Sequence, residues 1–337
     1  MLVNDKVYGE FEIVDPCAIA LIESPAFQRL FHVNQNGATV LMDPSWNTTR
    51  GEHCIGAYQL LQIFGASREE QIAGLLHDAN HLAFSHVIDY VFDDFIDQEA
   101  HHKVFEINPH LEELARIVEG FGISRDVIFN EEQFTLLEQP SGALCADRID
   151  YTFRDGLNTQ QTTVEEIRNV FLKHLVNHNG VFACNNAYVA DRFSRLSIDT
   201  DTIRASHSGV SLFFTLAAMI KRALTMGIIV KEDLLGTDDA ILGKLWESND
   251  PVFALFFQWI AAGAPIELGD SSSPIVAREK FRWIDPLVVI DGKLIKTTAL
   301  LPGLKKLAEQ MTYLKSAPRC VNLPKEFAAI LKAEQET

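Results

Sequence analysis

Apolar and polar positions alternate at helical spacing through much of the chain. The segment CAIALIESPAFQRLFHV shows this spacing after a short start that is expected to be extended. Two further segments begin with the residue pair of a capping box: TTRGEHCIGAYQLLQIFG with Thr49 and Glu52, and SREEQIAGLLHDA with Ser67 and Glu70. The first of them ends at Gly65, which is typical of a helix C-terminus. These patterns predict helices in the first part of the chain.

The rest of the pattern predicts further helices and two hairpins. We expect one helix from Ser141 to Gly156, and a longer stretch, ADRFSRLSIDTDTIRASHSGVSLFFTLAAMIKRALTMG, with a break at Ser-His-Ser-Gly. LVNHNGVFAC carries an Asn-Gly turn, LVVIDGKLIKT turns at Asp291-Gly292, and SSSP at 271–274 is typical of a linker. The predicted fold class is mostly α: a helical core over residues 1–235, and a C-terminal extension of helices and β-hairpins, over residues 236–337, packed on the core.

Composition narrows the class of protein. The chain has 337 residues, of which 47% are hydrophobic, enough for a globular core. Its apolar runs are shorter than the ~20 residues of a membrane-spanning helix, and no signal peptide is evident at its start. The five cysteines are scattered without paired spacing, so we expect reduced thiols and a cytoplasmic location.

The charge balance bears on partners. Lys and Arg number 29 against 46 Asp and Glu, a formal net charge of −17. Such a surface repels phosphate backbones, so we expect no stable binding of nucleic acid, and no membrane association either. A small phosphorylated substrate stays compatible with this charge, because a local group of arginines can reverse the field inside a cavity.

Candidate chemistry concentrates in LLHDANHLAFSHVIDYVFDD, where histidines and aspartates alternate with apolar residues. Burying such groups is costly unless they are paired, hydrogen-bonded or bound to a metal. His77 and Asp78 fall at the end of a predicted helix, His53 lies on the preceding helix, and Asp147 lies on a later one. Two imidazoles and two carboxylates suit one divalent cation such as Mn, Fe, Co, Zn, Ni or Mg, with positions left for water and a phosphate oxygen. Without a cysteine in the set, a closed structural zinc site is not expected.

The helix that carries Asp147 has a polar face. Asp147, Tyr151, Arg154 and Asp155 stand at i, i+4, i+7 and i+8, which places them on one side. The other side carries residues suited to a core: Leu144, Ile149 and Phe153. Such a face indicates a cavity wall, and the alternative is a solvated face of salt bridges.

In order and spacing, His53, His77-Asp78 and Asp147 resemble the H…HD…D metal signature of the HD-domain phosphohydrolases. The strongest similarity is to the deoxynucleoside triphosphate triphosphohydrolase branch, with its SAM- and HD-domain dNTPases and dGTPase-like proteins. SPAFQRLFHVNQNGATVL is similar to TPxFQRLRxIxQLG of that branch, TTRGEHCIG to NRFEHSLG, HDANHLAFSHVID to HDIGHGPFSHxFD, and ADRIDYTFRD to xDKxDYxxRD. The resemblance extends roughly from Asp15 to Leu224, and it implies an HD-domain helical bundle.

The resemblance also implies roles for single residues. One metal ion would be held by His53, His77, Asp78 and Asp147. His86 would protonate the leaving oxygen, as suits an imidazole, and His81 would contact phosphate. Asp89 would orient a further histidine, either His101 or His102, of which we prefer His101.

Substrate contacts follow from the same motifs. Their residues are Gln35, Arg50, Arg148, Tyr151, Asp155 and Arg195. The three arginines would bind phosphates, although the branch usually has a lysine at the place of Arg148. Tyr151 and Asp155 would contact phosphate and the sugar 3′-hydroxyl, and Gln35 would contact the sugar. Ile203 and Arg204 stand where the branch has a tyrosine that packs on deoxyribose and a glutamine, so the sequence leaves base selectivity undecided.

Three kinds of function compete. We expect a metal-dependent phosphohydrolase that cleaves a deoxynucleoside triphosphate to deoxynucleoside and triphosphate, and that forms a homo-oligomer. The alternatives within enzymes are an HD phosphomonoesterase or phosphodiesterase acting on another phosphorylated metabolite, and a di-iron oxygenase, which would need further ligands such as His81 and His101. A non-catalytic nucleotide sensor is the third kind, and it would have no need of His86 and Asp89 beside the metal.

Overall fold

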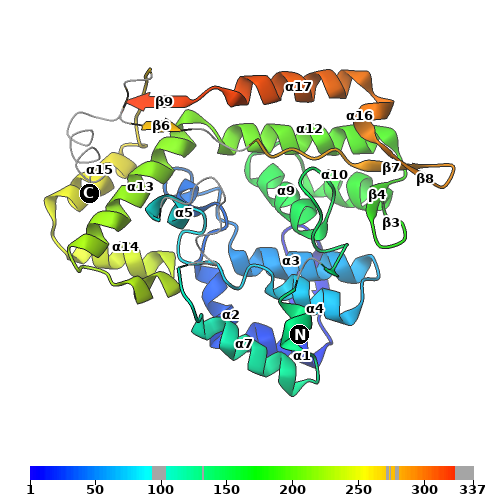
Figure 1. Ribbon diagram of the computed structural model, residues 1–337, viewed down its shortest axis with the longest axis horizontal. Coiled ribbons are helices and arrows are strands. Elements are labelled where there is room, and N and C mark those ends of the chain that lie inside the picture. Colours follow the sequence, from blue (N-terminus) through cyan, green and yellow to red (C-terminus); the bar gives the residue numbers. More distant parts are fainter. Residues whose placement is uncertain (93–103, 131–132, 271–272, 274, 278–280, 323–337) are drawn as a thin grey trace.

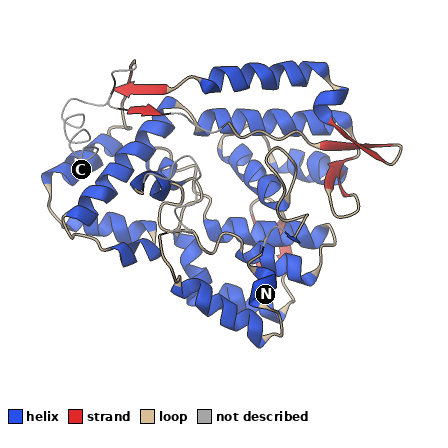
Figure 2. Cartoon of the chain, viewed as in Figure 1, coloured by secondary structure: helices blue, strands red, loops and turns tan. Residues whose placement is uncertain are grey.

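The computed structural model describes residues 1–92, 104–130, 133–270, 273, 275–277 and 281–322, and most of its elements are helices (Figures 1 and 2). In the first half of the chain, the elements in order are β1 (Leu2–Asp5), β2 (Gly9–Glu12), α1 (Pro16–Glu23), α2 (Pro25–Gln28), η1 (Arg29–His32), η2 (Gly37–Leu41), α3 (Arg50–Ile63), α4 (Arg68–Leu76), α5 (Val87–Val91), α7 (Pro109–Gly120), α8 (Arg125–Ile128), α9 (Ala146–Asn158), α10 (Val164–Glu166), η4 (Ile167–Phe171) and α11 (Leu172–His174). The mostly helical fold class predicted above is confirmed.

The second half contains two long helices and the remaining strands. Its elements are β3 (Leu175–Asn177), β4 (Phe182–Cys184), α12 (Ala187–Arg204), α13 (His207–Thr225), η5 (Lys231–Leu235), α14 (Asp238–Glu247), α15 (Pro251–Ala261), β5 (Glu267–Leu268), β6 (Ile275–Ala277), β7 (Leu287–Ile290), β8 (Lys293–Lys296), α16 (Thr297–Leu300), α17 (Pro302–Ser316) and β9 (Arg319–Asn322). Both predicted hairpins, β3–β4 and β7–β8, are present. The expected linker at 271–274 lies largely outside the described residues.

Local signals place the helices that carry the site. Thr49 caps α3, and the reciprocal bond of Glu52 completes the predicted capping box. Ser67 caps α4 in the same way, but the Glu70 side chain does not return a bond to the backbone of Ser67, so the predicted capping box is wrong here. The carboxylate of Glu70 instead accepts the backbone N–H groups of Leu136 and Leu137, at 2.7 and 3.1 Å. The sequence predicts only a local bond for the Glu70 side chain, but in the structure it binds residues far along the chain.

Helix α9 begins later than expected. It spans Ala146–Asn158, because residues 141–145 form turns and extended chain before it, so the predicted start at Ser141 is wrong by five residues. The expected core residues on its rear side, Ile149 and Phe153, are fully buried. The polar face splits into two rows, and only one of them lines a cavity.

The long stretch that was predicted to be helical forms two helices, α12 and α13, which are separated near the expected break. Ser206 ends the gap between them and caps α13 by accepting the N–H of Gly209. Within the described ranges, no single helix is long and apolar enough to span a bilayer, although α12 and α13, bent by 51° at the break, satisfy that test when taken together.

The C-terminal extension packs against the helical core. Strand β7 pairs in parallel with β4 through Cys184 and Val288, which joins the two hairpins in one four-stranded sheet, β3-β4-β7-β8. Helix α17 runs along α12 in Figure 1, and Lys315 of α17 forms an ion pair with Asp201 of α12. The boundary at residue 235 stays a prediction, but the extension contributes residues to the cavity described next.

Candidate metal centre and substrate cavity

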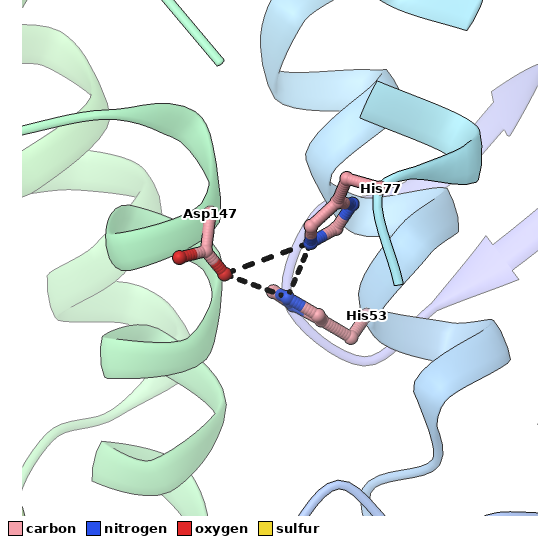
Figure 3. A group of neighbouring side chains, drawn as sticks. All are labelled: His53, His77 and Asp147. Carbon is pink, nitrogen blue, oxygen red and sulfur yellow. Dashed lines mark hydrogen bonds and ion pairs between the residues drawn. The ribbon is translucent and has the colours of Figure 1, made fainter. Parts of the chain in front are cut away.

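Three helices bring four candidate metal ligands together, and three of them, His53, His77 and Asp147, form a group with metal-ligand spacing. His53 comes from the first turn of α3, His77 and Asp78 follow the end of α4, and Asp147 lies in the first turn of α9. The Nε2 atoms of His53 and His77 are 3.1 Å apart, and Asp147 Oδ1 lies 3.0 Å from the first and 3.6 Å from the second (Figure 3). Asp78 Oδ2 completes the group at 3.6 and 3.8 Å from the same two nitrogens.

Hydrogen bonds fix the tautomers of both histidines. His53 donates from Nδ1 to Asp150 Oδ2 at 2.6 Å, and His77 donates from Nδ1 to the carbonyl of Gly74 at 2.8 Å. Since carboxylate and carbonyl oxygens can only accept, each Nδ1 carries a hydrogen, and the two Nε2 atoms face each other as the positions from which neutral rings could bind a metal. The arrangement of His53 and Asp150 is the carboxylate–histidine pair that commonly orients a metal ligand.

This donor set fits a divalent cation. Neighbouring ligand atoms about 2.0–2.2 Å from an ion, at tetrahedral or octahedral angles, lie roughly 2.8–3.6 Å from one another. The observed separations of 3.0–3.8 Å are close to this range before an ion draws the side chains inward. Two imidazole lone pairs and two carboxylates would repel each other without a positive charge between them. His53, His77, Asp78 and Asp147 are therefore suited to hold one metal ion.

The titration of the same groups leads to the same conclusion. Burial opposes a charge on His53, but its hydrogen bonds with Asp147 and Asp150 outweigh this effect and raise its pKa. For His77 burial is likewise outweighed, by the charge of Asp78 and a hydrogen bond to Asp147, and its pKa is raised well above 6.5. Burial would raise the pKa of Asp147, yet the two histidines hold it low. The carboxylates thus attract a proton to the place of the cation, so metal binding should release protons.

Of the predicted catalytic residues, His81 and His86 line the same cavity and Asp89 lies behind His86, while His101 is outside the described residues. His81 Nε2 lies 3.2 Å from Asp78 Oδ1, and burial followed by the charge of Arg50 lowers its pKa to about 3. His86 donates from Nδ1 to the buried carboxylate of Asp89 at 2.8 Å. The expected partnership of Asp89 with His101 or His102 falls outside the described residues.

The loop that carries His81 and His86 is held in a strained conformation. Phe84 and Ser85 have φ values of +60° and +49°, which non-glycine residues rarely adopt. The carboxylate of Asp238 accepts the N–H of Phe84 at 2.6 Å and that of Asn34 at 2.9 Å. Arg29, 7% exposed, donates to the carbonyls of Ala79 and His81 at 3.0 and 2.9 Å. Buried polar contacts therefore hold this loop in place.

A cavity of about 370 Å³ opens beside the four metal-binding side chains. Of the residues expected to contact substrate, it is lined by Gln35, Arg50, Arg148, Tyr151 and Asp155. Arg50 is 5% exposed and donates to Asp78 at 2.5 Å, to Ser85 Oγ at 3.0 Å and to the carbonyl of Gln35 at 3.3 Å. Burial raises the pKa of Asp155 to about 6, although Asn36 donates a hydrogen bond to it at 2.9 Å.

Two arginines that the sequence placed at the cavity lie elsewhere. Arg195 is on the exposed side of α12, bonded to Asp191 at 2.8 Å. Arg154 is 1% exposed and turns away from the cavity toward Asp150 and Asp5, at 2.7 and 2.8 Å. The expected single polar face of α9 is therefore wrong: the row of Asp147, Tyr151 and Asp155 lines the cavity, and the row of Asp150 and Arg154 packs beneath α3.

Sequence reasoning missed several residues of the site. They are Asn36, Asp150, Tyr90, Phe213, Arg282 and Trp283. Asp150 stands three residues after Asp147, a spacing that could have indicated a second carboxylate near the metal. Arg204, noted only as a departure from the resemblance, lines the cavity, whereas Ile203 beside it is 38% exposed and is not part of the lining. No local pattern marks Arg282, which comes from the C-terminal extension.

Glu138, Cys145 and Asp147 form a second group with metal-ligand spacing. Arg148 donates to Glu138 at 2.6 Å and to Cys145 Sγ at 3.3 Å. The guanidinium occupies the place that a second cation would need, so a single metal position remains the better interpretation.

Comparison with known proteins agrees with this geometry. The chain is 35% identical over 312 residues to the uncharacterised protein YdhJ of Bacillus subtilis (strain 168), an alignment that covers 92% of this chain and 95% of YdhJ. It is 38% identical over 172 residues to the metal-dependent phosphohydrolase cns2 of Cordyceps militaris, which covers 50% of this chain and 49% of that protein. The deoxynucleoside triphosphate triphosphohydrolase SAMHD1 of Danio rerio is 30% identical over 154 residues, 39% of this chain and 25% of that protein.

Solved structures share the fold. A phosphohydrolase from Bacteroides thetaiotaomicron superposes with a TM-score of 0.73 at 17% identity, over 96% of this chain and 99% of that one. A hypothetical protein from Aquifex aeolicus superposes with a TM-score of 0.61 at 16% identity, over 99% of both chains. No family model matches the sequence.

Proposed function

We propose that this chain, which belongs to the HD-domain metal-dependent phosphohydrolases, cleaves a deoxynucleoside triphosphate into deoxynucleoside and triphosphate. The observation that carries the proposal is the position of the donor set. His53, His77, Asp78 and Asp147 converge at a cavity that four arginines also line, from four different parts of the chain. In a chain of net charge −17, such a group of cations suits a polyanionic ligand.

Arg50 links the metal centre to phosphate binding. A guanidinium has five N–H donors, and the bonds to Asp78, Ser85 and Gln35 engage three of them. One N–H on each terminal nitrogen is left to donate to phosphate oxygens in the two-pronged geometry that arginine favours. Arg50 would therefore hold Asp78 in place and bind substrate at the same time. When bound, the cation would lower the pKa of a ligated water and neutralise charge on phosphorus.

His86 would act as the proton donor only in the presence of substrate. Burial, then the charges of Arg282, Arg50 and Arg204, hold its pKa well below 6.5, so the ring is neutral in the free protein at pH 7. A phosphate chain would offset those positive charges and raise the pKa of His86 again. Asp89 would keep Nδ1 protonated and present Nε2 to the leaving oxygen. Asp155 and Asn36 would accept and donate hydrogen bonds at the sugar.

Product analysis tests the reaction. The Mn-loaded protein is incubated with each of the four dNTPs, and the products are separated by anion-exchange chromatography. Deoxynucleoside and tripolyphosphate in equal amounts are expected, whereas release of orthophosphate or pyrophosphate alone would refute the proposed cleavage. His86→Ala should abolish turnover and keep the metal content, and exposed His32 gives a matched control, since His32→Ala should retain both.

The second candidate is a phosphomonoesterase acting on another phosphorylated metabolite. The observation that favours it is Ile203, which replaces the tyrosine expected to pack on deoxyribose and which does not line the cavity. A panel of sugar and nucleoside monophosphates, assayed for orthophosphate under the same conditions, separates the two reactions.

A further inference from the structure

Two of the arginines that line the cavity, Arg204 and Arg282, lie on a different side of it from Arg50. Arg204 lies in the last turn of α12, and Arg282 lies in the segment Phe281–Ile284 of the C-terminal extension. Arg204 shares one face of α12 with the cavity residues Ser197, Thr200 and Asp201. The position of the two arginines separates them from the contacts that hold Arg50.

A buried lysine supports this wall. Lys315 of α17 is 4% exposed and pairs with one oxygen of Asp201, while Arg204 donates to the other oxygen at 2.6 Å. Two cations therefore share one carboxylate. Lys315 Nζ also lies 4.9 Å over the ring of Phe281, which stacks on Trp283 with an interplanar angle of 20°. The same lysine thus positions Arg204 and the segment that carries Arg282.

Backbone hydrogen bonds fix the segment of Arg282 against the core. The N–H of Ile284 donates to Ser197 Oγ at 3.1 Å, and the N–H of Asp285 donates to the carbonyl of Gly142 at 2.8 Å. Ser197 and Gly142 both line the cavity, on α12 and on the loop before α9. These bonds tie the backbone two and three residues after Arg282 to the core, which favours a fixed position of Arg282 at the cavity and would reduce the entropy lost on binding.

These cations act on the reacting centre from more than one side. After burial, the charges that lower the pKa of His86 are those of Arg282, Arg50 and Arg204. All three arginines line the same cavity as His86. A phosphate at the metal would be bound by the ion and Arg50. Arg204 and Arg282 line another part of the same cavity, where they would meet negative charge elsewhere in the same ligand.

We propose that Arg204 and Arg282 form a second anion subsite, which takes a phosphate group of the substrate other than the one held at the metal. The inference rests on the proposed function only in assuming a phosphorylated substrate. It requires a substrate with a chain of at least two phosphates, as the proposed deoxynucleoside triphosphate has, and it makes the C-terminal extension part of substrate recognition. Lys315 is a positioning residue for this subsite.

Binding of inorganic phosphates tests the subsite without turnover. Orthophosphate, pyrophosphate and tripolyphosphate are titrated calorimetrically into the Mn-loaded protein and into Arg204→Gln and Arg282→Gln variants. Tripolyphosphate should bind the wild type more tightly than orthophosphate does. Each substitution should weaken tripolyphosphate by about 10- to 100-fold, the loss expected for charge-assisted hydrogen bonds, and leave orthophosphate almost unchanged. Arg195→Gln is the matched control on the exposed side of α12 and should change neither ligand.

The outcomes separate this proposal from the proposed reaction. Equal losses for orthophosphate and tripolyphosphate would overturn the second subsite, because they would place both arginines at one phosphate position. Unchanged tripolyphosphate binding in a variant with the thermal stability of the wild type would overturn it as well. Arg282→Lys should recover part of the lost affinity, which a purely structural role would not predict. Failure to hydrolyse dNTPs, with these binding differences intact, would refute only the cleavage proposed above.

Discussion

Replacement of Arg154 by Gln tests whether this side chain belongs to the support of the metal centre or to the cavity. Arg154 bonds Asp150 and Asp5 at 2.7 and 2.8 Å, and all three side chains are at most 4% exposed. Removing one partner of such a buried pair costs about 3–5 kcal/mol, because the other charges stay buried without compensation. The free energy of unfolding of Arg154→Gln, measured by urea denaturation in EDTA, should fall by about this amount.

The same substitution should weaken the metal. Asp150 Oδ2 accepts both the Nε–H of Arg154 and the Nδ1–H of His53, so Arg154 helps to orient a metal ligand from outside the ligand set. Loss of such outer contacts typically costs about 10- to 100-fold in metal affinity. Mn titration of the purified variant gives this value directly, and Arg195→Gln, which breaks an exposed pair worth at most ~1 kcal/mol, is the control.

One result would contradict a buried position of Arg154. If Arg154→Gln kept the stability and the Mn affinity of the control but raised KM for substrate, Arg154 would face the cavity, as the polar stripe of the sequence suggested. The buried network of Asp5, Arg154, Asp150 and His53 would then be wrong.

Three further predictions concern the same site. Asp147→Asn should reduce bound metal to near zero and remove the thermal shift on adding Mn, which in the wild type at 100 times Kd corresponds to about 2.7 kcal/mol; a retained shift would contradict the ligand set. Gly56→Ala should destabilise the protein by about 1–3 kcal/mol or more and weaken Mn binding, because the new Cβ would stand 2.1 Å from Asp150 Oδ1. Unchanged urea denaturation and Mn affinity would show that helices α3 and α9 are not so closely packed. Burial raises the pKa of Asp155 from 3.8 to about 6, so its contribution to stability is full below pH 3.8 and is lost as the pH rises through about 6. The Asp155→Asn side chain can still accept a hydrogen bond from Asn36, and the variant should show a flatter dependence of the unfolding free energy on pH between pH 4 and 7. An unchanged slope would refute the pKa shift.

Local chemistry made much of the helical framework predictable. The capping box of Thr49, the helix start at Ser67 and the Asn-Gly and Asp-Gly turns depend on neighbours within a few residues, and all of them are present. The start of α9 was missed because residues 141–145 meet the C-terminal extension, where Gly142 accepts the N–H of Asp285. A contact over such a sequence distance leaves no local pattern.

Helical periodicity also explains why the sequence did not predict correctly which arginines line the cavity. Arg195 and Arg204 are nine residues apart, which at about 100° per residue puts them on opposite sides of α12. The sequence motif favoured Arg195, and the fold turned that side to solvent. On α9 the polar stripe is wide enough to meet two environments, so Arg154 joins a buried ion pair while Asp155 lines the cavity.

The sequence by itself determined the helical class and the residues that could bind a metal, because capping, periodicity and ligand chemistry are properties of short segments and residue types. Only the tertiary structure decided which polar side chains face the cavity, that Asp150 supports His53, and that Arg282 enters from the C-terminal extension. Those outcomes depend on how helices far apart in the chain pack, and packing sets the direction of each polar face through contacts that no local spacing contains.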